Sequence, residues 1–290
     1  MLHGVGVLLV ALAPALGHPP CLPEEVTGPT TAAEPDVAPQ IVVTPPVVPA
    51  PPPVAIPPAL AQRERARYRL EYGPLSVGEL TIAIGGATPG AKTVRAGGRG
   101  AGAVLGLGRM SNSIATDFDL ERLDARRWNN SREDGDRALI DSAEQPTPGQ
   151  VTGARFRQRP HVRQSPIQAT FTAPLLDPLS FLLRLRAAPP TPGSSQVLYV
   201  LDGQALWRLT IQNAGRASLP EGTVAVATFR LDGRADPIHW DGSADEAERR
   251  RRTFSVWLSD DANKVPLRLE MPLGPSALVV ALTEISRRPL

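Results

Sequence analysis

Residues 254–271 read FSVWLSDDANKVPLRLEM, and this stretch decides the fold class. Apolar residues occupy every second position, first at 254, 256 and 258 and again at 267, 269 and 271. Between the two halves lie Asp260, Asp261 and Asn263, which are residues typical of turns. A period of two with one apolar face is typical of half-buried antiparallel strands. The stretch therefore predicts a β-hairpin that packs one face on a core.

The same alternation recurs at residues 68–72, 80–84 and 207–212, while residues 277–282 are apolar on both faces, as in a central strand. We expect about seven to ten antiparallel strands in one mainly β domain over residues 62–290. The strands should form a barrel or half-barrel, with a sandwich as the alternative.

Helical periodicity is scarce. Residues 177–186 read DPLSFLLRLR, with Asp177 in position to cap a helix, Pro178 at its first position and arginines in its last turn. They predict one short helix that ends before Pro189. Residues 111–128 are expected to hold a second turn or two.

The hairpin at 254–271 carries further expectations. Trp257 should face away from Val256 and either cover a second apolar layer or line a ligand cleft. Pro266 has no amide donor, which places it at a strand start or on an edge. Asp260 and Asp261 should tie down the turn, with Asn263 in the left-handed conformation.

The N-terminus has the form of an export signal. Residues 1–23 contain no charged side chain, and an apolar core at 5–13 is followed by Pro14 and an Ala-x-Gly site that predicts cleavage after Gly17. A permanent membrane anchor is disfavoured by Pro14 and by the short core. Cys21 offers lipidation as another alternative, although the residues before it depart from the usual pattern.

Residues 18–61 are predicted to be a disordered, proline-rich tether. Residues 40–60 contain eight prolines, which prevent helix and sheet and leave polyproline II. Such a segment either holds the domain away from an anchor or is a leader without a partner.

The charge pattern argues against nucleic acid as a partner. All 31 basic residues and all but four of the 29 acidic residues follow Gln62, so the body has a formal charge of only +6. This excess is too dilute for a basic face. The run Arg249–Arg252 follows Asp245, Glu246 and Glu248, so we interpret it as a solvated loop neutralised by these neighbours rather than as a contact for anionic lipid or polysaccharide. The body contains no apolar run of 18 residues, so we expect no membrane-spanning helix in it.

The search for catalytic and cofactor motifs finds none, so we expect no cofactor, no metal and no catalytic residue. His161 and His239 stand apart without a second ligand at a metal-binding spacing. The stretch Gly97–Gly102 lacks the spacing of a dinucleotide or phosphate loop and fits a strand with close backbone packing. Asp260 and Asp261 could do acid–base chemistry, but at a hairpin tip such residues more often cap backbone amides.

Three segments resemble a family of bacterial envelope proteins, domain of unknown function 3108. The stretch 254–270 is similar to the family's closing hairpin, a Trp-Leu-Ser/Thr-Asp-Asp strand end followed by a basic residue and an apolar-Pro-apolar-Arg strand. Residues 68–80 resemble its opening Tyr-x-x-x-Tyr hairpin, and residues 177–181 its Asp-x-Leu-Ser helix start. The resemblance implies an exported, β-rich protein and supplies no catalytic residues.

Three functions remain open. The first is a non-enzymatic periplasmic or outer-membrane-associated protein that binds an apolar or amphiphilic molecule such as a lipid. The second is an envelope scaffold that docks a protein partner, and the third is a hydrolase or transferase that uses Asp260 or Asp261. A cavity lined by residues such as Leu70, Ile82, Leu209 and Val256 would favour the first, and a filled core with an exposed apolar patch would favour the second.

Overall fold

The computed structural model describes residues 60, 62–86, 93–104, 108–134, 137–158, 162–171, 173–202, 205–219, 226–238 and 251–289. The predicted signal peptide, Cys21 and nearly all of the predicted tether lie outside these residues, as do His161, His239, Arg249 and Arg250.

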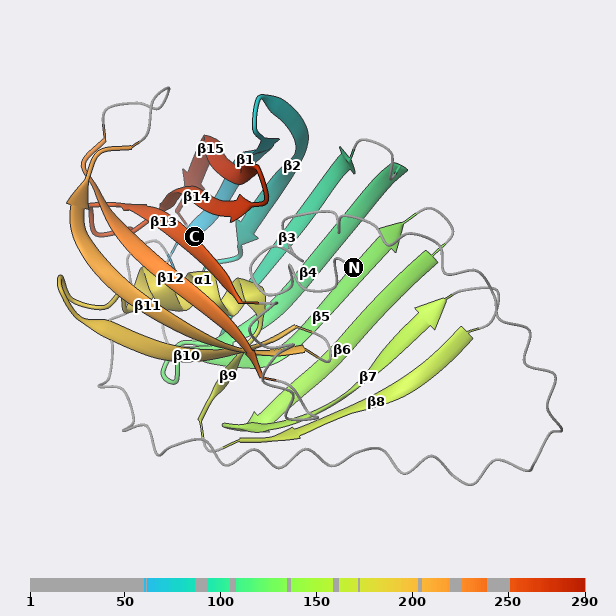
Figure 1. The fold of residues 1–290 in the computed structure, drawn as a ribbon. Coiled ribbons are helices and arrows are strands. Elements are labelled where there is room, and N and C mark those ends of the chain that lie inside the picture. The colour runs from blue at the N-terminus through green and yellow to red at the C-terminus, as the bar shows by residue number, and fades with distance from the viewer. Residues whose placement is uncertain are drawn as a thin grey trace, which may run out of the picture.

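The described residues form one sheet of 15 strands with a single helix (Figure 1). In chain order its elements are β1 (Arg63–Tyr72), β2 (Leu75–Ile84), β3 (Thr93–Val104), β4 (Gly108–Asp119), β5 (Asp124–Asp134), β6 (Arg137–Thr147), β7 (Gln150–Gln158), β8 (Val162–Thr170), β9 (Leu175–Leu176), α1 (Pro178–Ala187), β10 (Ser195–Asp202), β11 (Ala205–Ala217), β12 (Thr228–Ile238), β13 (Arg252–Ser259), β14 (Pro266–Leu273) and β15 (Ser276–Arg288).

Neighbouring strands in the sheet follow the order β8 to β1 and then β15 down to β9. Every pairing is antiparallel except that of β9 with β10. The sheet curls around α1 into a nearly closed barrel, as Figure 1 shows. The predicted mainly β barrel is therefore confirmed, and the sandwich alternative is wrong because all strands belong to one sheet.

The expected number of strands was too low because β3 to β8 carry weak apolar alternation. On β5, for example, Trp128 is buried but the next inward position is Asn130, so the apolar period stops after one residue. By contrast, β1 alternates between exposed and buried residues along most of its length, as predicted.

Helix α1 confirms its prediction. The Asp177 carboxylate accepts from the backbone amides of Leu179 (2.9 Å) and Ser180 (3.4 Å), and the Ser180 hydroxyl accepts from the Asp177 amide (2.8 Å). This reciprocal capping box has Asp177 as the N-cap, so the helix begins at Pro178. The expectation of helical turns within 111–128 is wrong for most of this stretch, because it forms β4 and β5. A single turn remains at Leu120–Leu123, where the two strands are joined.

Three apolar clusters surround α1. The largest lies between α1 and the strands β1, β2 and β10 to β15, and Phe181 meets Phe254 edge-on in it, with ring centroids 6.4 Å apart. The second joins β5, β6 and β7 to β9, β10 and β11. The third packs β3, β4 and the β4–β5 turn on Leu179 and Leu183, and it contains the fully buried Leu60.

The glycine-rich stretch Gly97–Gly102 is part of β3, and it allows close backbone approach to β2, as expected. A Cβ atom at Gly102 would lie 2.5 Å from the Val77 carbonyl oxygen, and one at Gly78 would lie 2.5 Å from that of Ala101. Both positions therefore require glycine.

The closing hairpin is β13 and β14. Pro266 begins β14, as predicted, and Asp261 ties down the turn by accepting from the Ser259 hydroxyl (2.7 Å) and the backbone amides of Asn263 (3.0 Å) and Lys264 (3.1 Å). The left-handed residue is Lys264, with a φ of 49°, rather than Asn263. The prediction placed the left-handed residue one position too early, because Asn263 and Lys264 both donate their amides to Asp261.

Trp257 is buried on the convex face of the sheet, beneath a cation. The Arg268 guanidinium lies 6.0 Å from the centroid of its ring, a cation–π contact. The expected choice between an apolar layer and a ligand cleft missed this contact, because the alternation reveals the face of a residue but not its neighbours.

Candidate functional site

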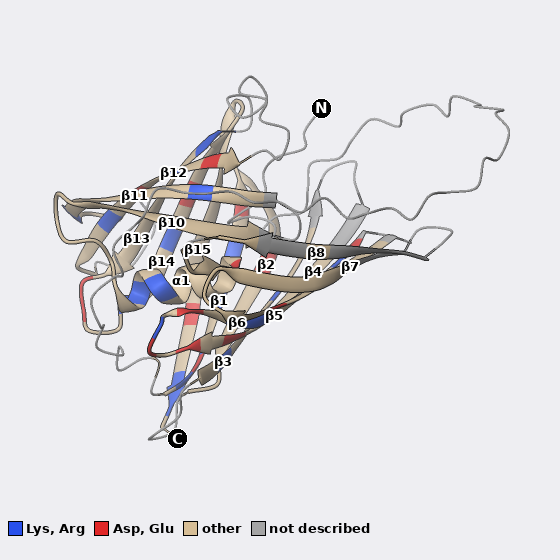
Figure 2. Ribbon diagram, turned by 90° about the horizontal axis from the view of Figure 1, so that it is seen from below, with Lys and Arg blue, Asp and Glu red and all other residues tan. Residues whose placement is uncertain are grey.

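Buried polar contacts fix α1 inside the sheet, and its arginines, whose positions are blue on the helix in Figure 2, make two of them. The Arg186 guanidinium forms a bidentate ion pair with Glu64 of β1, at 2.7 and 3.0 Å, and Arg287 of β15 donates to the same carboxylate at 3.0 Å. Side chains of Arg186 and Glu64 are only 4% and 3% exposed. Because a buried ion pair needs close geometry on both sides, this contact fixes the distance between α1 and the junction of β1 with β15.

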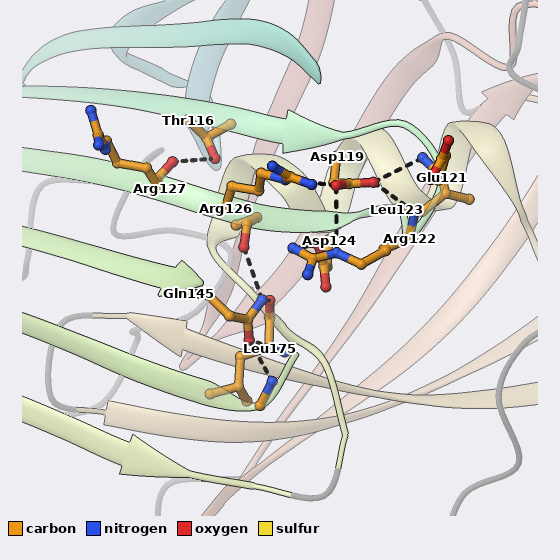
Figure 3. A network of polar contacts seen from close by, with 12 residues as sticks. Thr116, Asp119, Glu121, Arg122, Leu123, Asp124, Arg126, Arg127, Gln145 and Leu175 are labelled. Carbon is orange, nitrogen blue, oxygen red and sulfur yellow. Dashed lines mark hydrogen bonds and ion pairs between the residues drawn. The ribbon is translucent and has the colours of Figure 1, made fainter. Parts of the chain in front are cut away.

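The other end of the helix is held by β4. The Thr116 hydroxyl donates to the Asp177 carboxylate (2.9 Å) and thereby ties the helix cap to the sheet. Burial raises the pKa of Asp177, although its hydrogen bonds oppose this effect. Gln145 of β6 is fully buried nearby and bonds to the backbone of Ala125, Gly149 and Leu175 (Figure 3).

Two carboxylates face each other at the β4–β5 turn (Figure 3). Asp119 accepts from the amides of Glu121 and Arg122 (both 2.9 Å) and from Arg126 (2.7 Å); although burial raises the pKa of Asp119, these hydrogen bonds lower it overall. Asp124 is fully buried 3.1 Å from Arg122, and burial raises its pKa to about 6 against the opposing effect of that arginine.

Carboxylates with diverging pKa values can form an acid–base pair. Neither of these two lines the cavity described below. Instead, Arg184 of α1 donates to the carbonyl oxygens of Arg122 (3.0 Å) and Leu123 (3.2 Å), so the cluster holds the turn against the helix. We therefore assign the two carboxylates a structural role.

A small cavity lies within the sheet beside α1. It has a volume of about 20 Å³, which is room for about one water molecule. Its walls come from five strands and the helix, and they consist of Tyr68, Leu80, Ile82, Leu182, Val256, Pro266, Arg268, Leu269 and Val280.

Tyr68 brings a hydroxyl to this apolar wall. The side chain is 6% exposed, and no hydrogen bond to its hydroxyl exists within the described part of the chain. Burial raises the pKa of Tyr68, so the phenol is neutral and keeps a hydrogen to donate. A polar atom of a bound molecule could accept a hydrogen bond from this hydroxyl.

Of the four apolar residues expected to line a cavity, Ile82 and Val256 do so. Leu70 and Leu209 are instead buried in the largest apolar cluster. Sequence reasoning did not name Tyr68 as a cavity residue. The available signal was its position in the alternating stretch 68–72, and in the structure Tyr68 pairs with Leu80 of the next strand.

The two carboxylates considered for acid–base chemistry, Asp260 and Asp261, have separate structural contacts. Asp261 caps its turn, and although burial raises its pKa, the bonds from Ser259, Asn263 and Lys264 lower it overall. Asp260 forms ion pairs with Arg216 (3.1 Å) and Lys264 (3.7 Å). Both side chains lie outside the cavity lining.

Within the arginine run, Arg251 pairs with Asp236 at 2.6 Å. This acidic partner lies on β12, outside the group of acidic residues named from the sequence. Among the described residues, no group of three or more His, Cys, Asp or Glu side chains could hold a metal ion. The helix in the described ranges is also too short and too polar to cross a bilayer.

Exposed large apolar side chains in the described ranges are Leu75, Ile140 and Val226. They lie on β2, on β6 and before β12, so they are single residues rather than a patch. The scaffold alternative therefore lacks the apolar patch that it requires on this part of the molecule.

The fold and cavity define a class of protein, an antiparallel sheet that closes almost completely around one polar-anchored helix. The family model with the description "Protein of unknown function (DUF3108)" matches residues 67–283, and the chain belongs to this family. The family expected from the closing hairpin is thus confirmed. No curated protein matches the sequence.

Two solved structures are similar to this chain. One is the beta-barrel-like protein of domain of unknown function DUF1849 from Brucella abortus, with a TM-score of 0.49, 11% identity and coverage of 78% of this chain and 98% of the other. The second is LprF from Mycobacterium bovis, with a TM-score of 0.26, 11% identity and coverage of 79% of this chain and 89% of the other.

Proposed function

We propose that the protein is exported to the bacterial envelope and there binds an apolar or amphiphilic molecule without transforming it. The observation that carries this proposal is the cavity beside α1, because its walls are largely apolar and include Tyr68, whose hydroxyl makes no hydrogen bond to another residue in the described part of the chain. Ligand sites are typically apolar surfaces with few, well-placed polar groups.

Side chains of the cavity wall must move before a larger molecule can bind, because the cavity now has room for only about one water molecule. Leu182 of α1 and Ile82 of β2 are these side chains, because both are only half-buried while the neighbouring core residues are fully enclosed. A hydrocarbon chain would enter by displacing these two side chains, and the ion pairs at the helix end would keep α1 itself in place.

Native mass spectrometry tests binding directly. Full-length protein purified gently from its source should carry a lipid-like mass, and Ile82→Trp should lose that mass by filling the cavity. Ile140→Trp, on the convex face and 37% exposed, is the matched control and should retain it. A wild-type protein without bound mass, or equal loading of both variants, would contradict the proposal.

Export rests on the charge-free N-terminus and the Ala-x-Gly site before His18. Mass spectrometry of whole cells should find a mature N-terminus at His18, or a lipidated Cys21 if that alternative holds. A cytoplasmic protein that still begins with Met1 would overturn the proposed localisation.

A further inference from the structure

A row of residues crosses the concave face of the sheet from the cavity to Arg132. Tyr68 on β1 lies opposite Leu80 on β2, Leu80 opposite Gly100 on β3, Gly100 opposite Asn112 on β4, and Asn112 opposite Arg132 on β5. Directly opposed residues of antiparallel strands point to the same face. Arg132 therefore shares the concave face with Tyr68.

The alternation along β5 gives the same result independently. Trp128 and Asn130 are both buried on the concave side, and Arg132 follows at the next inward position. Four strand spacings separate Tyr68 from Arg132, so the row is about 19 Å long. Gly100 adds no side chain at its middle.

Arg132 has no counter-ion in the described part of the chain. It makes no hydrogen bond or ion pair there, and its Nε atom is buried without a partner. Its register neighbours Asn112 and Leu139 carry no charge, and the nearest acidic residue of β6 on this face is Asp141, one pair further along. A half-buried guanidinium of this kind matches a carboxylate or a phosphate, which accepts two parallel hydrogen bonds.

The row is therefore apolar at one end and polar at the other. At the Tyr68 end it opens on the apolar cavity, and at the Arg132 end it offers an amide and a cation. We infer that it binds an anionic amphiphile, with the hydrocarbon chain at the Tyr68 end and a carboxylate or phosphate head group on Arg132. This inference rests on the proposed binding function and specifies its ligand.

Calorimetric titration of the full chain with dodecanoate, dodecyl phosphate and dodecanol tests the inference. All three share one chain length, so differences report on the head group. The two anions should bind at least about tenfold more tightly than dodecanol, as expected for hydrogen bonds to a charged group. Whether dodecanoate or dodecyl phosphate binds more tightly will distinguish a carboxylate from a phosphate ligand.

Arg132→Gln should weaken both anions to the level of dodecanol and leave dodecanol unchanged, whereas Arg132→Lys should keep part of the preference because it keeps the charge. Arg99→Gln is the matched control, since Arg99 is an exposed arginine on the convex side of β3. Melting temperatures of the variants report whether each folds.

The outcomes separate the two proposals. If dodecanol binds as tightly as the anions, or if Arg99→Gln weakens the anions as much as Arg132→Gln, the head-group inference is wrong and the binding function stands. If Arg132→Gln weakens dodecanol equally, the arginine supports the fold and the inference is also wrong. If none of the three amphiphiles binds, the proposed function itself fails.

Discussion

Two regions of one sheet differ in what they place on its inner face: the strands β1, β2 and β10 to β15, and the middle of β4, β5 and β6. Around the helix, inner positions such as Leu209, Leu231 and Val256 are fully buried apolar residues that form a continuous core. Away from it, the corresponding positions on β4, β5 and β6 include Asn112, Asn130, Arg132 and Asp141. One part of the sheet is lined by apolar side chains, and the other carries polar side chains on its inner face, of which Asn130 and Asp141 are buried.

This contrast has a physical basis in the position of the helix. Inner residues that meet α1 lose their water and must be apolar or exactly paired, as Glu64 is with Arg186. On β5 and β6, Asn130 and Asp141 are also buried, and both have interaction partners that offset the cost of burial. The predictions below test the two regions against each other.

The largest effect should come from Phe181→Ala, at the centre of the helix-side core. Phe181 is fully buried against Phe254, so we expect a loss of about 3–5 kcal/mol in the free energy of unfolding. Ile140→Ala on the convex face of β6 should cost less than about 0.5 kcal/mol. Urea denaturation measures both, and a loss for Phe181→Ala as small as that for Ile140→Ala would show that Phe181 is not packed as a core residue.

A comparable effect should follow from breaking the buried ion pair. Glu64→Ala leaves Arg186 buried without its partner, which should cost about 3–5 kcal/mol. Glu284→Ala removes the exposed partner of Arg67 and should cost at most about 1 kcal/mol. If the Glu64 variant is as stable as the Glu284 variant, α1 is not held by this contact.

Asp124 should make the stability of the β4–β5 turn depend on pH. Its pKa is raised by burial from 3.8 to about 6, so the folded state binds a proton more readily than the unfolded state. Stability should therefore decrease as the pH rises from about 4 to above 6, by about 3 kcal/mol in total. Asp119, Arg122 and Arg184 are the charged groups around it.

Asp124→Asn provides the test, because asparagine keeps the shape and cannot ionise. Chemical denaturation at pH 5 and pH 7 should show that the variant loses less stability than the wild-type protein over this interval. An identical pH dependence in both proteins would refute the assignment to Asp124.

The smallest effect should be at the closing hairpin. Asp261→Ala removes the acceptor for two backbone amides and a hydroxyl, and we expect a loss of about 1–2 kcal/mol, measured as a shift in denaturation midpoint. Asp260→Ala should cost less, because its ion-pair partner Arg216 is 88% exposed. An Asp261 variant with full stability that lost a measurable activity would restore the enzyme hypothesis.

Much of the architecture was predictable where an element is specified by residues that are close together in the sequence. The alternation in Phe254, Val256 and Leu258 predicted a half-buried strand, and Asp177-Pro178 predicted the start of α1, because these patterns depend on neighbours only a few positions apart. The strands β4 and β5 were not predicted, since Asn130 and Arg132 at inner positions break the apolar period.

The candidate site was only partly predictable. Ile82 and Val256 were expected at a cavity and line it, but Tyr68 was not identified, and Arg132 was not considered because it lies in a stretch without a recognisable motif. Their relation depends on four strand pairings whose register is set by the whole sheet.

The sequence by itself determined the mainly β class, the single helix with its cap, the close approach at Gly102 and the family. Each follows from local spacing or from a short motif. Only the tertiary structure decided that Glu64 pairs with Arg186 122 positions later, and that Tyr68 and Arg132 share one row of the concave face. The physical reason is that ion pairs and strand register join residues far apart in the chain, and local periodicity contains no information about which partners meet.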